Sequence, residues 1–278
     1  MAHEQPQSVL RFEHVNVLFN ETKALDDVSF EVSSGETRVI LGAAGSGKTV
    51  LLKTALGLIK PDSGAVRVFG QDLGGMTEPE LFHIRSRIGV LFQEGGLFDS
   101  LTVEENVSYP LENLAEFQLP PDQVHERAAE ALRFVELEQT LDKFPSALSG
   151  GMRRRVGIAR AVVTEPPLVL YDSPTAGLDP ITAYTIVALI AKERDLKNTT
   201  TVMATHRYQD GHFMATCRFD ANTGRAEPVA AEEVGLGTVF MVLKQGRIAF
   251  EGTLAEFNAS LDPYVAKFVR HEDTEPRP

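Results

Sequence analysis

The feature that most constrains this sequence is a glycine-rich segment, residues 42–49 (GAAGSGKT), placed between two segments of different hydrophobic pattern. Residues 37–41 form a short apolar run typical of a buried strand, and residues 49–59 have the spacing of a helix. The segment fits the pattern GxxxxGK[ST], in which backbone N–H groups and a helix N-terminus surround a phosphate group. A strand, a phosphate loop and a helix in this order predict a nucleotide-binding fold.

Further strand-like and helix-like segments alternate along the chain. Residues 9–19 and 24–32 alternate in polarity and are expected to form an antiparallel pair. Apolar strands are expected at 65–69, 88–92, 168–171 and 200–204, and a helix at 181–194. This order predicts an α/β fold with a P-loop NTPase core, a mostly parallel sheet and an antiparallel β subdomain.

A long helical stretch interrupts the strands. Residues 102–160 have charged residues interleaved with apolar ones at three- and four-residue spacing, and prolines at 110, 120, 121 and 145 are expected to break them into pieces. Because this stretch lies between two strands of the sheet, we expect an inserted α-helical subdomain at about 94–162.

The domain boundaries follow from these patterns. Residues 9–270 are expected to form a single nucleotide-binding domain between disordered tails at 1–8 and 271–278. The polar segment 220–235 lies between strand-like residues 215–219 and 238–243, which predicts a hairpin insertion at about 215–243.

Composition excludes several classes of protein. The longest apolar runs are far shorter than the roughly 18 residues needed to cross a bilayer. A formal net charge of −12 argues against nucleic acid as a partner, because phosphate backbones attract basic surfaces. The single cysteine, Cys217, excludes an internal disulfide framework and fits a reducing compartment. The start of the chain has no apolar stretch of the secretory kind, so a cytosolic protein is expected.

The phosphate loop and one later strand supply the residues of a Mg²⁺-nucleotide site. Lys48 is expected to reach the β- and γ-phosphates, and the Thr49 hydroxyl to bind Mg²⁺. Asp172 directly follows the apolar run 168–171, where a second Mg²⁺ anchor is expected.

A second anion-binding helix start lies at Ser149-Gly150-Gly151, just before a helical pattern. One chain binds one γ-phosphate but has two loops suited to phosphate. This excess indicates that the second loop serves the nucleotide of another chain.

Together these residues resemble the ATP-binding subunits of ABC transporters, and the resemblance covers about residues 9–252. Residues 148–152 (LSGGM) resemble the family's signature, which usually ends in Gln, and residues 176–179 (AGLD) its D-loop. Gln93 matches the Q-loop glutamine and His206 the switch histidine. Phe19 stands where the family stacks an aromatic ring on adenine, although packing in the core is an equally good role for it.

The resemblance implies ATP and Mg²⁺ as cofactors. Two copies of the chain, expected to be a homodimer, would hold two ATP molecules between the phosphate loop of one copy and Ser149–Gly151 of the other. Integral-membrane permease subunits would be the further partners, at the cytoplasmic face of the inner membrane, with the chain bound peripherally. The implied metal ligands are Thr49, Gln93 and Asp172. The implied nucleotide-binding residues are Phe19, Gly42, Ala43, Gly45, Ser46, Gly47, Lys48, Thr49, Val50, Gln93, Ser149, Gly150, Gly151, Asp179 and His206.

The sequence departs from the family at the catalytic base. The family places a glutamate after the Walker B aspartate, whereas this chain has Ser173, whose hydroxyl is too weak a base to accept a proton from water at neutral pH. One hypothesis is that Glu94, which follows Gln93, replaces the base, and the alternative for Glu94 is a solvated loop residue. A third possibility is a different, glutamate-bearing partner ATPase, which would make this chain the degenerate half of a heterodimer. Arg207 also departs, since an acid is commoner after the histidine. The candidate catalytic residues are Glu94, His206, Gln93, Asp172 and Ser173.

Residues 90–107 are similar to the ATPase subunits of Mla/Mce-type systems, which move phospholipids or other hydrophobic molecules. This resemblance implies lipid transport and an MCE-type lipid-binding protein in the wider complex. Two alternatives stay open. Ser173 favours a nucleotide-gated clamp or degenerate subunit with little hydrolysis, and import of a small solute is the alternative for the substrate.

Overall fold

The computed structural model describes residues 8–93, 95–114, 117 and 119–270. Ser8 is the first residue of a strand and lies opposite Ser33, so the predicted disordered tail 1–8 is wrong at its last residue. Residues 1–7 and 271–278 lie outside the described residues, and the prediction of disordered tails there stays a prediction.

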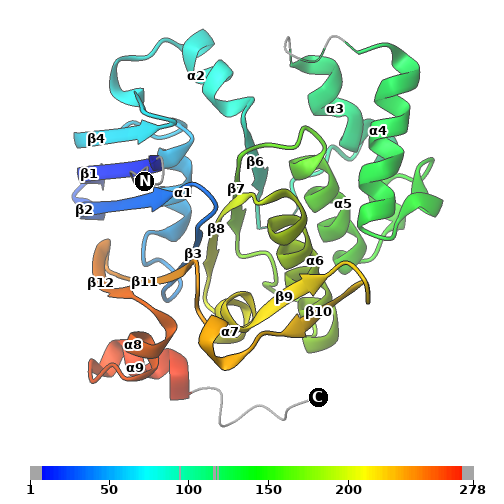
Figure 1. Cartoon of the computed structure of the whole chain (residues 1–278). Helices are drawn as coiled ribbons and strands as arrows, with labels where there is room; N and C mark the ends of the chain where they lie inside the picture. Colours follow the sequence, from blue (N-terminus) through cyan, green and yellow to red (C-terminus); the bar gives the residue numbers. More distant parts are fainter. Residues whose placement is uncertain (1–7, 94, 115–116, 118, 271–278) are drawn as a thin grey trace, which may run out of the picture.

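The centre of the fold is a six-stranded sheet in which five neighbouring strands are parallel and the strand at one edge is antiparallel (Figure 1). In spatial order its strands are β12 (Arg247–Gly252), β11 (Thr238–Lys244), β3 (Thr37–Leu41), β8 (Thr200–Thr205), β7 (Leu168–Asp172) and β6 (Ile88–Leu91). The predicted mostly parallel sheet is confirmed.

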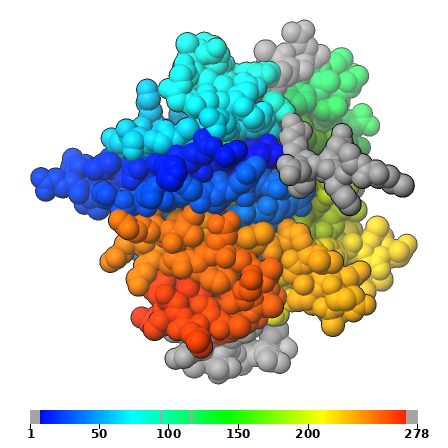
Figure 2. Space-filling model, turned by 60° about the vertical axis from the view of Figure 1, so that its left-hand side comes forward, coloured from blue at the N-terminus to red at the C-terminus, as the bar shows by residue number. Residues whose placement is uncertain are grey.

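A four-stranded antiparallel sheet forms one side of the molecule, and its order is β2 (Thr22–Ser33), β1 (Ser8–Phe19), β4 (Ser63–Val68) and β5 (Gln71–Asp72). The pairing of β1 with β2 confirms the predicted antiparallel pair. In Figure 2 these two strands form a blue band between the cyan region of β4 and α2 and the orange region of β11 and β12.

Helices flank the central sheet, and α3, α4 and α5 gather beside β6, as the sequence predicts for a helical insertion (Figure 1). The helices are α1 (Lys48–Ala55), α2 (Glu78–Arg85), α3 (Val103–Asn113), α4 (Pro121–Phe134), α5 (Gly150–Val162), α6 (Pro180–Lys197), α7 (Tyr208–Thr216), α8 (Leu254–Asn258) and α9 (Pro263–Arg270). Short 3₁₀ turns occupy Leu73–Gly75, Glu138–Thr140, Pro145–Ala147 and Ala231–Glu233. No helix in the described part of the chain is long and apolar enough to span a membrane.

Local sequence explains most helix ends. Thr102 and Glu105 form a capping box at the start of α3, in which each side chain accepts a hydrogen bond from the other's backbone N–H. Pro121 opens α4, where its missing N–H costs no hydrogen bond. The predicted break at Pro110 is wrong, because Pro110 lies inside α3. Pro110 removes one backbone hydrogen bond, and the helix continues for three residues beyond it.

Strand β7 contributes to a hydrophobic core on each face of the central sheet. Leu168 and Leu170 pack in the core beneath the antiparallel sheet and α1, and Val169 and Tyr171 pack in the core formed with α3, α5 and α6. Successive side chains of a strand point to opposite faces, so a strand covered on both sides is apolar throughout. All five residues of β7 are buried.

The predicted hairpin between residues 215–219 and 238–243 is wrong. Strand β9 (Cys217–Asp220) pairs instead with β10 (Arg225–Pro228), while β11 pairs with β3 in the central sheet. Six of the seven residues of β11 are at least partly buried, as expected of a strand inside a covered sheet. The inserted hairpin therefore ends at Pro228, and residues 238–243 belong to the core of the fold.

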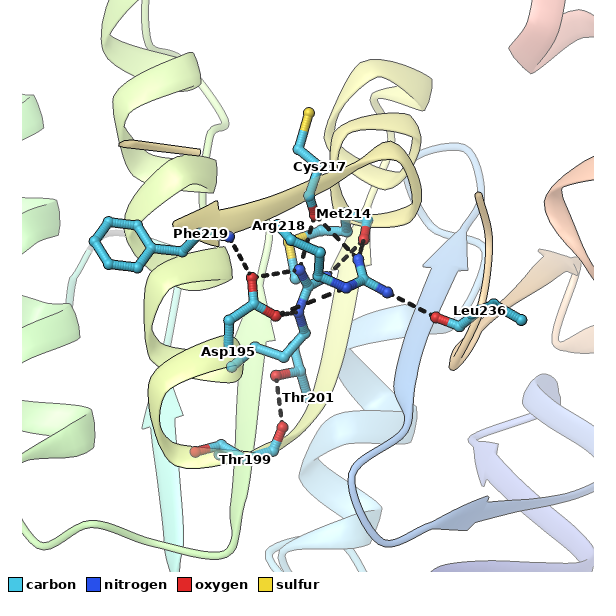
Figure 3. Close-up of polar contacts among 9 residues, drawn as sticks. Asp195, Thr199, Thr201, Met214, Cys217, Arg218, Phe219 and Leu236 are labelled. Carbon is cyan, nitrogen blue, oxygen red and sulfur yellow. Dashed lines mark hydrogen bonds and ion pairs between the residues drawn. The ribbon is translucent and has the colours of Figure 1, made fainter. Parts of the chain in front are cut away.

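The β9–β10 hairpin is fastened to the end of α6 by a polar cluster (Figure 3). Asp195 accepts a hydrogen bond from the backbone of Phe219 at 2.7 Å and pairs with the adjacent Arg194 at 2.6 Å. Arg218 donates to the carbonyl oxygen of Leu236 at 2.7 Å, and Arg194 donates to that of Met214 at 2.6 Å. The hairpin is thus held by charged groups whose partners are mostly backbone atoms.

Helix α6 also carries a buried carboxyl group, Glu193, which is only 4% exposed. Burial raises the pKa of Glu193 to about 7, although a hydrogen bond from Thr199 and the charge of Lys197 act in the opposite direction. The folded chain therefore holds this proton more tightly than the unfolded chain does.

We predict that Glu193→Gln flattens the pH dependence of stability between about pH 4.5 and pH 7. In this window the folded state keeps a proton that the unfolded state loses, so the wild-type free energy of unfolding falls as the pH rises. The full effect is up to about 3 kcal/mol. Urea denaturation at pH 5 and pH 8 measures it, with the exposed Glu126→Gln as control. If the free energy of unfolding changes equally between pH 5 and pH 8 in the wild type and in Glu193→Gln, the prediction is contradicted.

Candidate functional site

A cavity of about 1010 Å³ lies at the edge of the central sheet where β3 and β8 end. Most of its lining comes from the phosphate loop, the start of α1 and the start of α7. The lining residues are Ala24, Ala43, Ala44, Gly45, Ser46, Gly47, Lys48, Thr49, Val50, Gln93, Ser173, Ala176, His206, Arg207, Tyr208, Gln209, Tyr264, Lys267 and Phe268.

The glycines of the phosphate loop are required by its shape. Gly47 has φ +108°, and a Cβ atom there would stand 2.5 Å from the carbonyl oxygen of Ala24. A Cβ atom at Gly42 would stand 2.3 Å from Ser46 Oγ and 2.7 Å from the carbonyl oxygen of Leu243. The loop can therefore pack tightly against the neighbouring chain only with glycine at these positions.

The two polar residues that begin α1 are already oriented by short hydrogen bonds. Lys48 Nζ donates to the carbonyl oxygens of Gly42 at 2.7 Å and Ala43 at 3.0 Å. Burial lowers the pKa of Lys48, and the charge of Asp172 opposes this shift. Thr49 Oγ1 donates to Asp172 Oδ2 at 2.8 Å, which joins the start of α1 to the end of β7.

These residues fit a Mg²⁺-nucleotide. Ser46 Oγ is buried in the loop and has no hydrogen-bond partner among the described residues, so it is available to a phosphate oxygen. Thr49 and Asp172 together offer the oxygen ligands that Mg²⁺ prefers. The described part of the chain has no group of three or more His, Cys, Asp or Glu side chains that could hold a metal. Two protein ligands supplemented by phosphate and water are the usual arrangement for Mg²⁺ at nucleotides.

The predicted site residues from other segments differ in their position relative to the cavity. Gln93, Ser173 and His206 line the cavity together with the loop. Phe19, at the end of β1, is 49% exposed and does not line it, so its contact with adenine stays a prediction. Glu94 lies outside the described residues, and its proposed role as base stays a hypothesis.

The second anion-binding loop lies away from this cavity. Ser149 caps α5 by accepting a hydrogen bond from the backbone of Met152, and neither Ser149 nor Gly150–Gly151 lines the cavity. Asp179 likewise caps α6, and hydrogen bonds from Thr182 lower the pKa of its carboxyl. Ser149, Gly150 and Asp179 are exposed to solvent.

Ser173 occupies a constrained position directly beside Asp172. Its φ is +50°, in the left-handed region that only a few non-glycine residues adopt. Its Oγ donates to Asp172 Oδ1 at 3.3 Å, and its backbone N–H donates to the carbonyl oxygen of Ala204 at 2.7 Å. The side chain faces the cavity but carries no group that accepts a proton from water at neutral pH.

The sequence does not reveal that α9 lines the cavity through Tyr264, Lys267 and Phe268. Tyr264 OH accepts a hydrogen bond from Ala43 N at 3.3 Å and donates to the carbonyl oxygen of Leu243 at 3.2 Å. Aromatic residues at positions i and i+4 indicate a packed helix face, and nothing in that spacing tells which surface it packs on.

Residues 25–176 match the sequence model of a protein family described as ABC transporter. The methionine import ATP-binding protein MetN of Corynebacterium efficiens is 44% identical over 189 residues, which are 68% of this chain and 52% of that protein. The methionine import ATP-binding protein MetN 2 of Rhodococcus jostii is 37% identical over 241 residues, or 85% of this chain and 68% of that protein. The chain spans about half the length, 51–54%, of several of the curated relatives that it matches.

A solved structure supports the same assignment. An ATP-binding cassette described as a dimer in a post-hydrolysis state bound to ADP and Pi has a TM-score of 0.72 and 30% identity to this chain. The match covers 88% of this chain and 99% of that structure. The predicted P-loop fold is therefore confirmed.

We predict that Ser173→Glu raises the rate of ATP hydrolysis by about 10²–10⁴-fold over Ser173→Gln, because only the carboxylate can accept a proton from water. The glutamine variant is the matched control, since the two side chains have the same length. Initial rates of phosphate release at saturating Mg²⁺-ATP measure the difference. Equal rates for the two variants would mean that the base lies elsewhere, with Glu94 as the first candidate.

Proposed function

This chain belongs to the ABC transporter family, and we propose that it binds and hydrolyses Mg²⁺-ATP as a homodimer that drives import of a small solute through a membrane permease. The permease subunits would hold the chain at the cytoplasmic face of the membrane. The strongest support is the cavity lined by Lys48, Thr49, Gln93 and His206, where Thr49 is hydrogen-bonded to the buried Asp172.

The proposal assigns a role to each of the main polar residues of the site. Lys48 binds the phosphates, and Gln93 and His206 contact the γ-phosphate and the attacking water. Thr49 and Asp172 hold Mg²⁺, which neutralises phosphate charge when it is bound. Ser173 cannot supply the base, so hydrolysis depends on a carboxylate from another position or on slow attack by water.

Dimerisation follows from the separation of the two anion-binding loops. Ser149–Gly151 begin a helix of 13 residues whose N-terminus attracts anions, yet they do not line the cavity of their own chain. A second copy would bring this helix start to the γ-phosphate. The dimeric cassette with ADP and Pi that this chain resembles supports the arrangement.

The relatives favour a small solute as the substrate, with methionine as the first candidate, since both curated relatives described above are named as methionine import proteins. This was the alternative reading of the sequence. The main interpretation, Mla/Mce-type lipid transport with an MCE-type partner, rests on a resemblance carried mainly by residues 90–107 and has no support from these relatives.

We predict that Ser149→Glu abolishes ATP-dependent dimerisation while each monomer still binds ATP. The added carboxylate would face the γ-phosphate of the partner's nucleotide, and like charges repel. Light scattering with and without Mg²⁺-ATP measures dimerisation, and a fluorescent ATP analogue measures binding. Ser146→Glu, at an exposed serine three residues earlier, is the control. Dimerisation of Ser149→Glu like that of the wild type would contradict the proposed interface.

We predict that Lys48→Ala reduces both ATP hydrolysis and the uptake of labelled methionine to background, because the phosphates lose their buried cation. Cells that carry Lys48→Ala in place of the wild-type chain provide the uptake measurement, and the purified chain provides the hydrolysis rate. Lys60→Ala, at an exposed lysine that does not line the cavity, is the control. Normal methionine uptake together with altered phospholipid distribution would favour lipid transport instead.

A further inference from the structure

Asp210 is a buried carboxylate in the first turn of α7, only 2% exposed and outside the cavity lining. One of its oxygens, Oδ2, accepts hydrogen bonds from Thr175 Oγ1 at 2.6 Å and from Thr205 Oγ1 at 2.7 Å. Its other oxygen, Oδ1, lies 3.6 Å from Nε of Arg207. A buried charge is tolerated only where such partners surround it.

The two threonines belong to different segments of the site. Thr175 lies between Ser173, which lines the cavity, and the D-loop that ends at Asp179. Thr205 is the last residue of β8 and directly precedes His206. Both hydroxyls are buried, and both donate to the same carboxylate oxygen. A displacement of either segment therefore strains the hydrogen bond made by the other.

The segment after Asp172 is held on its other side by the helix that follows the signature. Arg154 on α5 donates to the carbonyl oxygen of Ala176 at 3.1 Å and of Ser173 at 3.5 Å. Thr175 lies between these two carbonyl groups in the sequence. The D-loop segment is thus connected to α5 through Arg154 and to the His206 segment through Asp210.

We propose that Asp210 is a positioning residue that couples the D-loop segment to His206, so that the two segments keep one mutual arrangement and His206 stays in place for ATP hydrolysis. This inference rests on the proposed function, because the position of His206 matters for turnover only if the chain hydrolyses ATP. Arg207 stands where an acid is expected after the histidine, and the carboxylate of Asp210 lies three residues later in the chain. The ion pair between them holds Arg207 at the cavity wall.

Valine substitutions test the coupling, since valine matches the shape of threonine without its hydroxyl. Thr175→Val and Thr205→Val are each expected to lower kcat about tenfold, the size typical for loss of one hydrogen bond to a charged group. The double variant is expected to be no slower than the slower single variant, because either change breaks the same connection. ATP affinity and KM are expected to stay within about twofold of the wild type, because neither threonine lines the cavity.

Serine variants separate coupling from general destabilisation. Thr175→Ser and Thr205→Ser keep the hydroxyl and are expected to recover most of the wild-type kcat. Asp210→Asn keeps an oxygen that accepts both hydroxyls but loses the charge facing Arg207. Thermal unfolding of every variant identifies any loss of fold. The proposal would be overturned if the reductions in kcat of the two single valine variants multiplied in the double variant. It would also be overturned if the valine variants kept the wild-type kcat.

Hydrogen exchange provides a readout that does not depend on turnover. Thr175→Val is expected to speed amide exchange in residues 204–209, and Thr205→Val to speed it in residues 173–179. Exchange that changes only around the substituted residue would overturn the coupling even if hydrolysis falls. If the wild-type chain does not hydrolyse ATP but each valine variant still speeds exchange in the other segment, the result would count against the proposed ATPase function and in favour of the connection through Asp210.

Discussion

Every element of the nucleotide site depends on the parallel pairing of β3, β8 and β7, because parallel strands end at the same edge of a sheet. The pairing places the loop after β3, the residues after β7 and the residues after β8 beside one another. The hydrogen bond from Thr49 to Asp172 is a direct consequence, since it joins α1 to a strand that is two positions away from β3. Without this register, Thr49 and Asp172 would not be close enough to form their hydrogen bond.

The same edge also brings buried charge close to the site. Lys48, Asp172 and Asp210 are all buried within a few residues of strand ends, and each is paired with hydrogen-bond partners or an opposite charge. Burial of this kind costs free energy unless the partners are held in place. The surrounding core is apolar on both faces of the sheet and supplies that rigidity.

Phosphate binding and proton transfer are separable in this chain. The glycine loop, Lys48 and the Thr49–Asp172 pair need only backbone geometry and fixed charge, and all are present. Proton transfer needs a base beside the γ-phosphate, and Ser173 is not one. The family resemblance therefore applies more directly to nucleotide binding than to the rate of hydrolysis.

The sequence by itself determined the strand–loop–helix motif, the antiparallel pair at the start and the alternation of strands and helices. These features depend on spacings within about twenty residues, which periodicity and glycine placement report directly. Only the tertiary structure decided that β11 pairs with β3 rather than with 215–219, that α9 lines the cavity and that Asp210 joins Thr175 to Thr205. All three findings concern residues that lie far apart in the sequence or that bind one shared oxygen atom. A pattern of polarity along the chain cannot tell which distant partner a buried strand or side chain contacts.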